Sequence, residues 1–418
     1  MEHVKKIKDT EDKSELEGHE ISIKSKDEIA VLGDTINEMT HGLVKAALAS
    51  KDLTIGKEVQ KKFIPLETDP QGNKLTTGHL DATYTEFFGY YEGAKGVSGD
   101  YFDYINLDDR YFAIIKCDVA GKGVPAALIM VQVATLFLNS FRNWKPTPEG
   151  LNISRVVYEI NDLLEKLKFK GRFAAFTLCL FDSKTGLVRF CNAGDNIVHW
   201  FDASSGSLQT LTLPPSPAAG VLDNDLIDMK GGYQMQTLQL DPGDVLFLYT
   251  DGIEEAKRSF RDSAYQIITC SEGENGAVHG NHVAGQSDEE LGYDRVSAII
   301  NAVFNRQQFI LEKYHNPDSE QKLVFDFTNC QGTITEAVMA LVSVEKIFRL
   351  YKAPDVKGDE RVLVDKKVDE FLAAHFKQYG YYVQQKLDNS QQKEYLYYMG
   401  IREDEQYDDL TILGIRRK

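Results

Sequence analysis

The stretch Ile114–Met130, IIKCDVAGKGVPAALIM, joins an apolar run, an aspartate and a glycine-rich turn to a second apolar run. The first run is typical of a buried strand that ends at Asp118, and Pro125 suits the first turn of a following helix. The turn does not fit a P-loop, because that motif ends in Gly-Lys-Ser/Thr and here Gly123 follows Lys122. We therefore expect the aspartate to carry the chemistry of this segment.

Three other motifs share this design, in which an apolar run meets an aspartate beside a glycine or a second aspartate. They read VSGDYFD, LFLYTDGIEEA and YDDLTILGI, and they present Asp100, Asp251, and Asp408 with Asp409. A strand holds such an aspartate at its end, and a neighbouring glycine lets an ion or ligand approach the backbone. The repetition predicts that the four motifs converge on one site.

Several carboxylates in one place repel one another unless a cation lies between them. Oxygen ligands of this kind suit magnesium or manganese, and two such ions roughly 3.5–4 Å apart can activate a water and polarise a phosphoryl group. A structural calcium site is an alternative that predicts stabilisation without turnover. Each motif alone indicates only a turn, so the prediction depends on all four together.

The apolar pattern after residue 80 predicts an α+β fold. Strand-like runs such as YFAIIKCDV, FAAFTLCLFD and DVLFLYTDG are linked by short turns, and helical segments are expected near 125–143 and 153–168. Hairpin-linked strands with segregated helices favour α+β over a parallel sheet. Residues 305–400 show two amphipathic helical patterns and are expected to form a helical insertion before the last strand, DDLTILGIRR.

Composition limits the partners and the compartment. The 418 residues are 42% hydrophobic, with a formal charge of −17 and no basic stripe, so we expect no nucleic-acid partner. The five cysteines are dispersed and odd in number, which favours reduced thiols in the cytoplasm. We find no run of about 20 apolar residues and no signal peptide, and we expect a cytoplasmic protein.

The N-terminal residues predict a coiled coil. Apolar residues alternate at spacings of three and four, interrupted by Ser50, which favours a parallel homodimer over one amphipathic helix on its own domain. The seam consists of Ile29, Leu32, Ile36, Met39, Leu43, Ala46 and Leu53. The preceding EGHEISIKSKDEI resembles the connector of a HAMP signalling module, which implies the cytoplasmic part of an inner-membrane receptor.

The four acidic motifs resemble those of the SpoIIE/RsbU branch of the PPM (PP2C-like) serine/threonine phosphatases, over roughly residues 80–300 and 400–418. The resemblance implies an α-β-β-α sandwich of two antiparallel sheets. It also implies two Mn²⁺ or Mg²⁺ ions and hydrolysis of a phosphoserine or phosphothreonine monoester by water. Members of this family often act on phosphorylated STAS-domain antagonists of anti-sigma factors, so such a phosphoprotein is the expected partner.

The resemblance also assigns roles to single residues. Asp118 is expected to bridge both ions. For Lys122, which the resemblance does not assign, two alternatives stay open, namely a contact with the substrate phosphate and a solvated lysine in the turn. Asp409 and Glu255 are expected just outside the metal ligands. The full set of expected metal ligands is Asp100, Asp118, the carbonyl of Val119, Asp251 and Asp408.

Two departures from the family pattern bear on activity. The family often has NAGH after its central hairpin, whereas this chain has NAGDN, with Asp195 in place of the histidine. The segment Val119–Gly121 offers no side-chain acid for the leaving group, so a water bound to the metals is the default proton donor. The alternative hypothesis is a catalytically weak scaffold that uses the same fold to bind a partner protein.

These observations divide the chain into five expected segments. The pair His279 and His282 has a spacing seen in zinc sites, but no cysteine pair lies near it and we do not expect a metal there. The segments are 1–55 (HAMP-like segment and coiled-coil helix), 56–79 (linker or switch helix), 80–304 (first part of the phosphatase domain), 305–400 (helical insertion) and 401–418 (last strand and metal motif).

Overall fold

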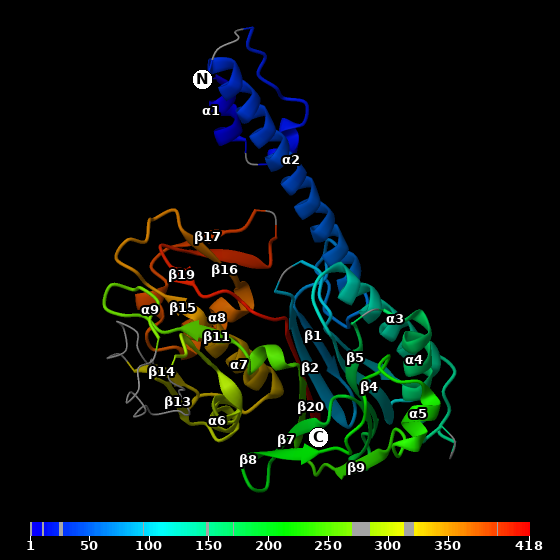
Figure 1. Ribbon diagram of the computed structural model, residues 1–418. Coiled ribbons are helices and arrows are strands. Elements are labelled where there is room, and N and C mark those ends of the chain that lie inside the picture. Colours follow the sequence, from blue (N-terminus) through cyan, green and yellow to red (C-terminus); the bar gives the residue numbers. More distant parts are fainter. Residues whose placement is uncertain are drawn as a thin grey trace. The chain divides into compact units, whose positions relative to one another are not determined.

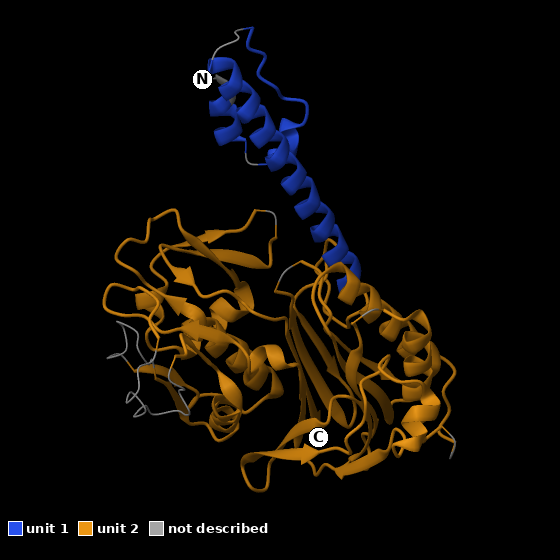
Figure 2. Cartoon of the chain, viewed as in Figure 1, with its two compact units in different colours: residues 1–61 blue, residues 62–418 orange. Residues whose placement is uncertain are grey.

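The computed structural model describes residues 2–10, 12–24, 28–94, 96–147, 150–169, 171–269, 285–312, 322–390 and 392–418. The chain divides into two compact units, residues 1–61 and 62–418 (Figure 2). His279 and His282 lie outside the described residues, as does Cys270. The other four cysteines, Cys117, Cys179, Cys191 and Cys330, are buried free thiols.

The first unit consists of two α-helices joined by a connector that includes a short 3₁₀ helix. Its elements are α1 (Glu2–Asp9), the short 3₁₀ helix η1 (Lys13–Leu16) and α2 (Glu28–Lys61). The connector is fastened to α2 by the side chain of Asn37, which accepts from the backbone N–H of Ile21 at 2.7 Å and donates to its carbonyl at 2.9 Å. A side chain at Gly33 would collide with Ile23, so this glycine lets the connector pack closely.

Some residues of the predicted seam on α2 pack inside the first unit, and the others are exposed to solvent. Ile36 and Leu43 pack against a small core of Ile7, Leu16 and Val44. The five other seam residues are exposed, namely Ile29, Leu32, Met39, Ala46 and Leu53. The helix runs without a break through residue 55, the last residue of the first expected segment, and ends at Lys61.

The second unit is built on two antiparallel sheets. The six-stranded sheet has the order β1-β2-β20-β10-β7-β8, and the five-stranded sheet has the order β3-β4-β5-β6-β9. Their bounds are β1 Thr77–Asp81, β2 Thr85–Glu92, β3 Tyr101–Asn106, β4 Tyr111–Val119, β5 Ala174–Asp182, β6 Leu187–Ala193, β7 Ile197–Asp202, β8 Ser207–Thr212, β9 Met235–Gln239, β10 Val245–Tyr249 and β20 Leu410–Arg417.

Helices cover the outer face of each sheet (Figure 1). Helices α3 (Val124–Phe141), α4 (Ser154–Leu167) and α5 (Asn224–Met229) lie on the side of the five-stranded sheet. Helices α6 (Gly292–Phe304) and α7 (Ile334–Arg349) lie on the side of the six-stranded sheet, with α7 packed against β2 and β20. The predicted α+β fold, an α-β-β-α sandwich, is confirmed.

Residues 305–400 contain strands as well as helices, so the expectation of a purely helical insertion is wrong. The pattern VLVDKKVDEFLAAHF was interpreted as one helix, but VLVD lies in strand β16 and the helix begins at Lys366. The elements are β13 Gln308–Leu311, β14 Leu323–Asp326, β15 Leu350–Tyr351, β16 Arg361–Asp365, α8 Lys366–His375, α9 Tyr379–Tyr382, β17 Lys386–Asp388, β18 Tyr395–Met399 and β19 Arg402–Glu403.

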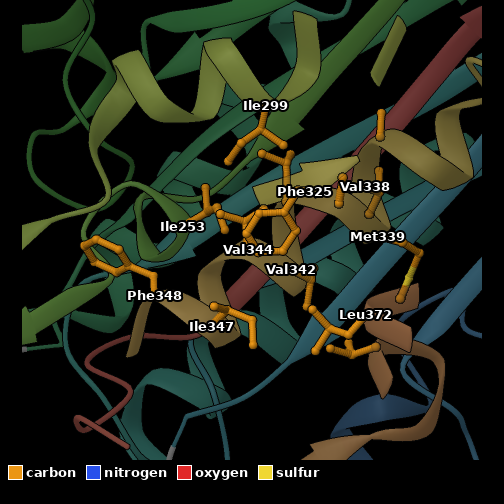
Figure 3. Packing of buried hydrophobic residues seen from close by; sticks show 14 of the residues in the cluster. Ile253, Ile299, Phe325, Val338, Met339, Val342, Val344, Ile347, Phe348 and Leu372 are labelled. Carbon is orange, nitrogen blue, oxygen red and sulfur yellow. The ribbon is translucent and has the colours of Figure 1, made fainter. Parts of the chain in front are cut away.

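Helix α7 lies in the hydrophobic core on the outer face of the six-stranded sheet. It begins with a capping box, in which Thr333 accepts from the N–H of Glu336 at 3.2 Å and Glu336 accepts from the N–H of Thr333 at 2.9 Å. All but two of its residues are buried, and they pack in a cluster that includes Ile253 and Phe325 (Figure 3). Ile253 belongs to the short 3₁₀ helix η2 (Asp251–Ile253), so this core supports the turn that carries Asp251.

Among the described residues, one helix is long and apolar enough to cross a membrane by length and composition, namely α3. Its buried residues, which include Ile129, Val133 and Phe137, belong to the core cluster of the five-stranded sheet. Packing inside the fold therefore accounts for the apolar character of α3.

Candidate active site

The five-stranded sheet brings two of the predicted aspartates together. Strands β3 and β4 pair with Tyr101 opposite Cys117, and one further step along this register places Asp100 opposite Asp118. Burial and the charge of Asp118 raise the pKa of Asp100 well above its usual range. Burial and the charges of Asp251 and Asp408 raise the pKa of Asp118 to about 7. The two carboxylates therefore share one electrostatic environment.

The six-stranded sheet brings the other two motifs together. Strands β10 and β20 pair with Tyr249 opposite Ile412, and the N–H of Thr250 donates to the carbonyl of Thr411 at 3.1 Å. The next turn carries Asp251, and a Cβ at Gly252 would lie 1.9 Å from the carbonyl oxygen of Asp409. Only glycine permits this approach, which brings Asp251 beside the Asp408–Asp409 pair. Burial and the charge of Asp408 raise the pKa of Asp251.

Hydrogen bonds connect the two sheets at this end. Thr250 Oγ1 donates to Asp100 Oδ2 at 2.6 Å, and Ser98 Oγ donates to Asp409 Oδ2 at 2.5 Å. Asp409 also accepts from the N–H of Ala94 at 2.7 Å. Asp409 is thus held by the chain segment before β3. This position is consistent with its expected place just outside the metal ligands.

The other predicted residues lie around this group. A Cβ at Gly99 would lie 2.7 Å from the carbonyl oxygen of Val119, so a glycine is needed for the backbone before Asp100 to pass this close to that carbonyl. Burial and the charge of Asp251 raise the pKa of Glu255, which places its carboxylate near the site. Lys122, the candidate phosphate contact, has its Nζ 3.0 Å from Asp408 Oδ2 and also donates to the carbonyl of Tyr407.

Within the described ranges, no three His, Cys, Asp or Glu side chains are arranged closely enough to hold a metal ion. Lys122 pairs with Asp408, and hydroxyl groups hold Asp100 and Asp409, so these carboxylates are occupied by neighbours. The donor set nevertheless fits a hard divalent cation, because it consists of carboxylates, and burial together with neighbouring carboxylates raises the pKa of Asp100, Asp118 and Asp251. A cation between these carboxylates would offset the repulsion among their charges, which contributes to the raised pKa values.

Lys116 is a functional candidate that the sequence analysis missed. Its Nζ donates to the carbonyl of Tyr249 at 3.0 Å and lies 2.8 Å from Asp195 Oδ2, which also accepts from Thr177 Oγ1 at 2.6 Å. Lys116 precedes Asp118 by two residues on β4, so both side chains point to the same face of the sheet. The signal in the sequence was a lysine within the apolar run IIKCDV, with the unusual Asp195 as its partner.

A cavity of about 350 Å³ opens beside Asp251. It lies between β4, β7, β8, β10 and helix α6. Of the residues that line it, the sequence analysis named only Asp195 and Asp251. The other lining residues are Lys116, Ile197, His199, Thr210, Phe247, Tyr249, Glu254 and Tyr293.

Residues 108–288 match the family described as stage II sporulation protein E (SpoIIE). This part of the chain is similar to SpoIIE-type domains. The match includes Asp118, Asp195 and Asp251, whereas Asp100 and Asp408 lie outside it. The matched residues also include every residue that lines the cavity except Tyr293, and the fold adds the other two acidic motifs from flanking segments.

Relatives of known name align with about half of this chain. Protein IcfG of Synechocystis sp. is 28% identical over 57% of this chain and 40% of its own length. Phosphoserine phosphatase RsbP of Bacillus subtilis is 27% identical over 48% of this chain and 47% of its own length. The chain thus spans about half or less of these two relatives. The solved SiaA-PP2C domain of Pseudomonas aeruginosa is 16% identical, with a TM-score of 0.47 over 90% of this chain and 99% of that one.

Proposed function

We propose that this protein is a metal-dependent serine/threonine phosphatase that hydrolyses a phosphomonoester on a partner protein. The observation that carries the proposal is the approach of four acidic motifs from two sheets, where burial and neighbouring carboxylates raise the pKa of Asp100, Asp118 and Asp251. The similarity to SpoIIE-type domains and the phosphoserine phosphatase relative RsbP support the same activity. The proposed catalytic segments are 80–304 and 401–418.

The metal ligands of this proposal are the carboxylates of Asp100, Asp118, Asp251 and Asp408 together with the carbonyl of Val119. When bound, two Mn²⁺ or Mg²⁺ ions supply a nucleophilic water at neutral pH and stabilise charge on the phosphoryl oxygens. Lys122 then has a second task, because its ammonium loses Asp408 as a partner and can bind a substrate phosphate oxygen. Asp409 and Ser98 hold the segment that carries Asp100.

Metal dependence tests the proposed activity. We expect the purified chain to release phosphate from p-nitrophenyl phosphate and from a phosphoserine peptide in the presence of Mn²⁺ or Mg²⁺. Excess EDTA should abolish turnover, and added Mn²⁺ should restore it, because the carboxylates have no other means of activating water. A phosphorylated STAS-domain protein is the first protein substrate to test.

Two results would contradict the phosphatase proposal. The first is turnover that EDTA leaves unchanged. The second is an absence of turnover together with an absence of metal binding in calorimetric titration. Tight binding of a partner protein in that second case would favour the alternative of a signalling scaffold.

We further propose that a second copy of the chain covers the exposed part of the α2 seam. Leu32 is 58% exposed and Met39 is 54% exposed, which is unusual for large apolar side chains at heptad spacing. A dimer through these residues would allow the N-terminal helix to control the site, as expected for a HAMP-like module. Placement of the chain in the cytoplasm, with or without an upstream membrane segment, stays a prediction.

The double substitution Leu32→Glu and Met39→Glu tests this dimer. We expect light scattering coupled to size-exclusion chromatography to report a dimer for the parent and a monomer for the variant, because buried like charges would repel across the seam. Lys51→Glu, at an exposed position on the same helix, serves as the control. A monomeric parent contradicts the dimer, and a monomeric variant with unchanged turnover contradicts control by the helix.

A further inference from the structure

The cavity beside Asp251 has a rigid aromatic wall. His199 stacks on Tyr249 with ring centroids 5.3 Å apart and on Tyr293 with centroids 4.9 Å apart. His199 Nδ1 is 3.0 Å from Thr210 Oγ1, which is 2.9 Å from the hydroxyl of Tyr293. Burial and the nearby Lys116 charge lower the pKa of His199 to about 4, so the ring is neutral at physiological pH. The wall is therefore preformed and uncharged.

The charges in the cavity leave one carboxylate without a cation. Lys116 is balanced by Asp195 at 2.8 Å, and Asp251 belongs to the proposed metal site. Glu254 Oε1 accepts from the hydroxyl of Tyr249 at 2.7 Å, but none of the described lysine, arginine or histidine side chains forms an ion pair with Glu254. Lys116 is the cation whose charge acts on Glu254, but its ammonium is already paired with Asp195. A cation that entered the cavity would supply the missing charge.

We propose that this cavity binds a basic side chain, arginine or lysine, that flanks the phosphorylated residue of the protein substrate. The inference rests on the proposed phosphatase function and gives its substrate a sequence preference. A guanidinium is attracted to the face of a Tyr ring and pairs with a carboxylate through charge-assisted hydrogen bonds. A volume of about 350 Å³ is large enough for one such side chain, and Asp251 connects the cavity to the acidic site.

Matched phosphoserine peptides test the preference. Each peptide carries one arginine at a position from four residues before to four residues after the phosphoserine, and its partner peptide carries citrulline there. Citrulline keeps the shape of arginine and lacks its charge, so the ratio of the two kcat/KM values measures the charge alone. We expect a ratio of about tenfold or more at one or two positions, and a ratio near one at the others.

The variant Glu254→Gln tests the cavity itself. We expect this isosteric change to reduce the arginine-to-citrulline ratio to between one and two, while Glu159→Gln on the exposed face of α4 retains the parental ratio. The ratio does not depend on the amount of active enzyme, so a partial folding defect does not mimic the result. A thermal melt of each variant confirms the comparison.

Two outcomes would overturn the inference. One is a preference for arginine that is equal at every position and is not reduced by Glu254→Gln. Such a preference would reflect only the attraction of a positive peptide to a protein with a net charge of −17. The other is a ratio near one at all positions. If no peptide is hydrolysed, the phosphatase function fails, and fluorescence anisotropy with the same peptides decides the cavity separately. Tighter binding of one arginine peptide, lost in Glu254→Gln, supports it, and equal binding of arginine and citrulline peptides overturns it.

Discussion

Replacing Asp118 with asparagine is expected to lower the turnover of p-nitrophenyl phosphate by about 10³-fold or more. The comparison is the loss of one donor from an oxyanion hole, which lowers kcat by about 10²–10³-fold, and Asp118 is proposed to contact both ions. The kcat value of the variant is measured at saturating Mn²⁺. Asp251→Asn is expected to lower kcat as well. Asp251 follows a strand of the opposite sheet, and its charge helps to raise the pKa of Asp118, so the two carboxylates belong to one site.

The same substitution is expected not to destabilise the protein without metal. The charges of Asp251 and Asp408 repel Asp118, and the asparagine removes one partner of this repulsion. In EDTA at pH 8, above the raised pKa of about 7, the melting temperature of Asp118→Asn should equal or exceed that of the parent. Stabilisation by added Mn²⁺ should shrink, since a ligand that binds more weakly stabilises the fold less at the same concentration.

Asp103→Asn is the matched control for Asp118→Asn. Burial raises the pKa of Asp103 to about 7 as well, but its carboxylate accepts from the hydroxyl of Tyr101 and the N–H of Tyr104, both at 2.8 Å. Asp103 is the last residue of the VSGDYFD motif, but its hydrogen bonds are to Tyr101 and Tyr104 on its own strand and not to the other acidic motifs, so turnover and the effect of Mn²⁺ should stay close to the parent. Equal losses in both variants would mean that burial of a carboxylate, rather than membership of the site, determines activity.

The strands and the four motifs could be predicted because they are local features of the sequence. The run YFAIIKCDV forms β4 with the predicted bounds, and DVLFLYTDG contains β10. Antiparallel pairing then places residues at opposite ends of neighbouring strands side by side, which explains why Asp100 meets Asp118. The prediction of convergence needed only the repeated position of an aspartate at a strand end.

The cavity and the 305–400 region could not be predicted in the same way, because they depend on contacts between distant segments. Lys116 and Asp195 are far apart in the sequence, and neither residue alone indicates a buried ion pair. In VLVDKKVDEF the apolar spacing fits a helix, but Val362 and Val364 pair with β18 as part of a sheet. Tertiary pairing there outweighs the local period.

Loss of a buried arginine on α7 is expected to destabilise the region 305–418 strongly. Arg349 is 1% exposed and pairs with Glu345, which is also 1% exposed, one turn earlier on the helix. Its Nη1 donates to the carbonyl of Asp404 at 3.0 Å and lies 3.5 Å from Glu403 Oε2. These contacts hold the segment that leads to Asp408 and β20 against α7.

The substitution Arg349→Met is therefore expected to lower the free energy of unfolding by about 3–5 kcal/mol, because it leaves the buried carboxylate of Glu345 without a partner. Urea denaturation followed by circular dichroism measures the loss. The double variant Arg349→Met and Glu345→Leu should regain most of it, since an apolar pair of similar volume avoids the burial of an unpaired charge. Glu403 retains Lys346 at 3.0 Å in both variants.

Arg402→Met separates burial from ion pairing as such. Arg402 pairs with Glu360 at 2.5 Å, but the arginine side chain is 34% exposed, so its loss should lower the free energy of unfolding much less than the loss of Arg349 does. Equal losses for Arg349→Met and Arg402→Met would contradict the assigned role of burial. A double variant as unstable as Arg349→Met would show instead that the bond to the Asp404 carbonyl, and not the charge of Glu345, accounts for the stability.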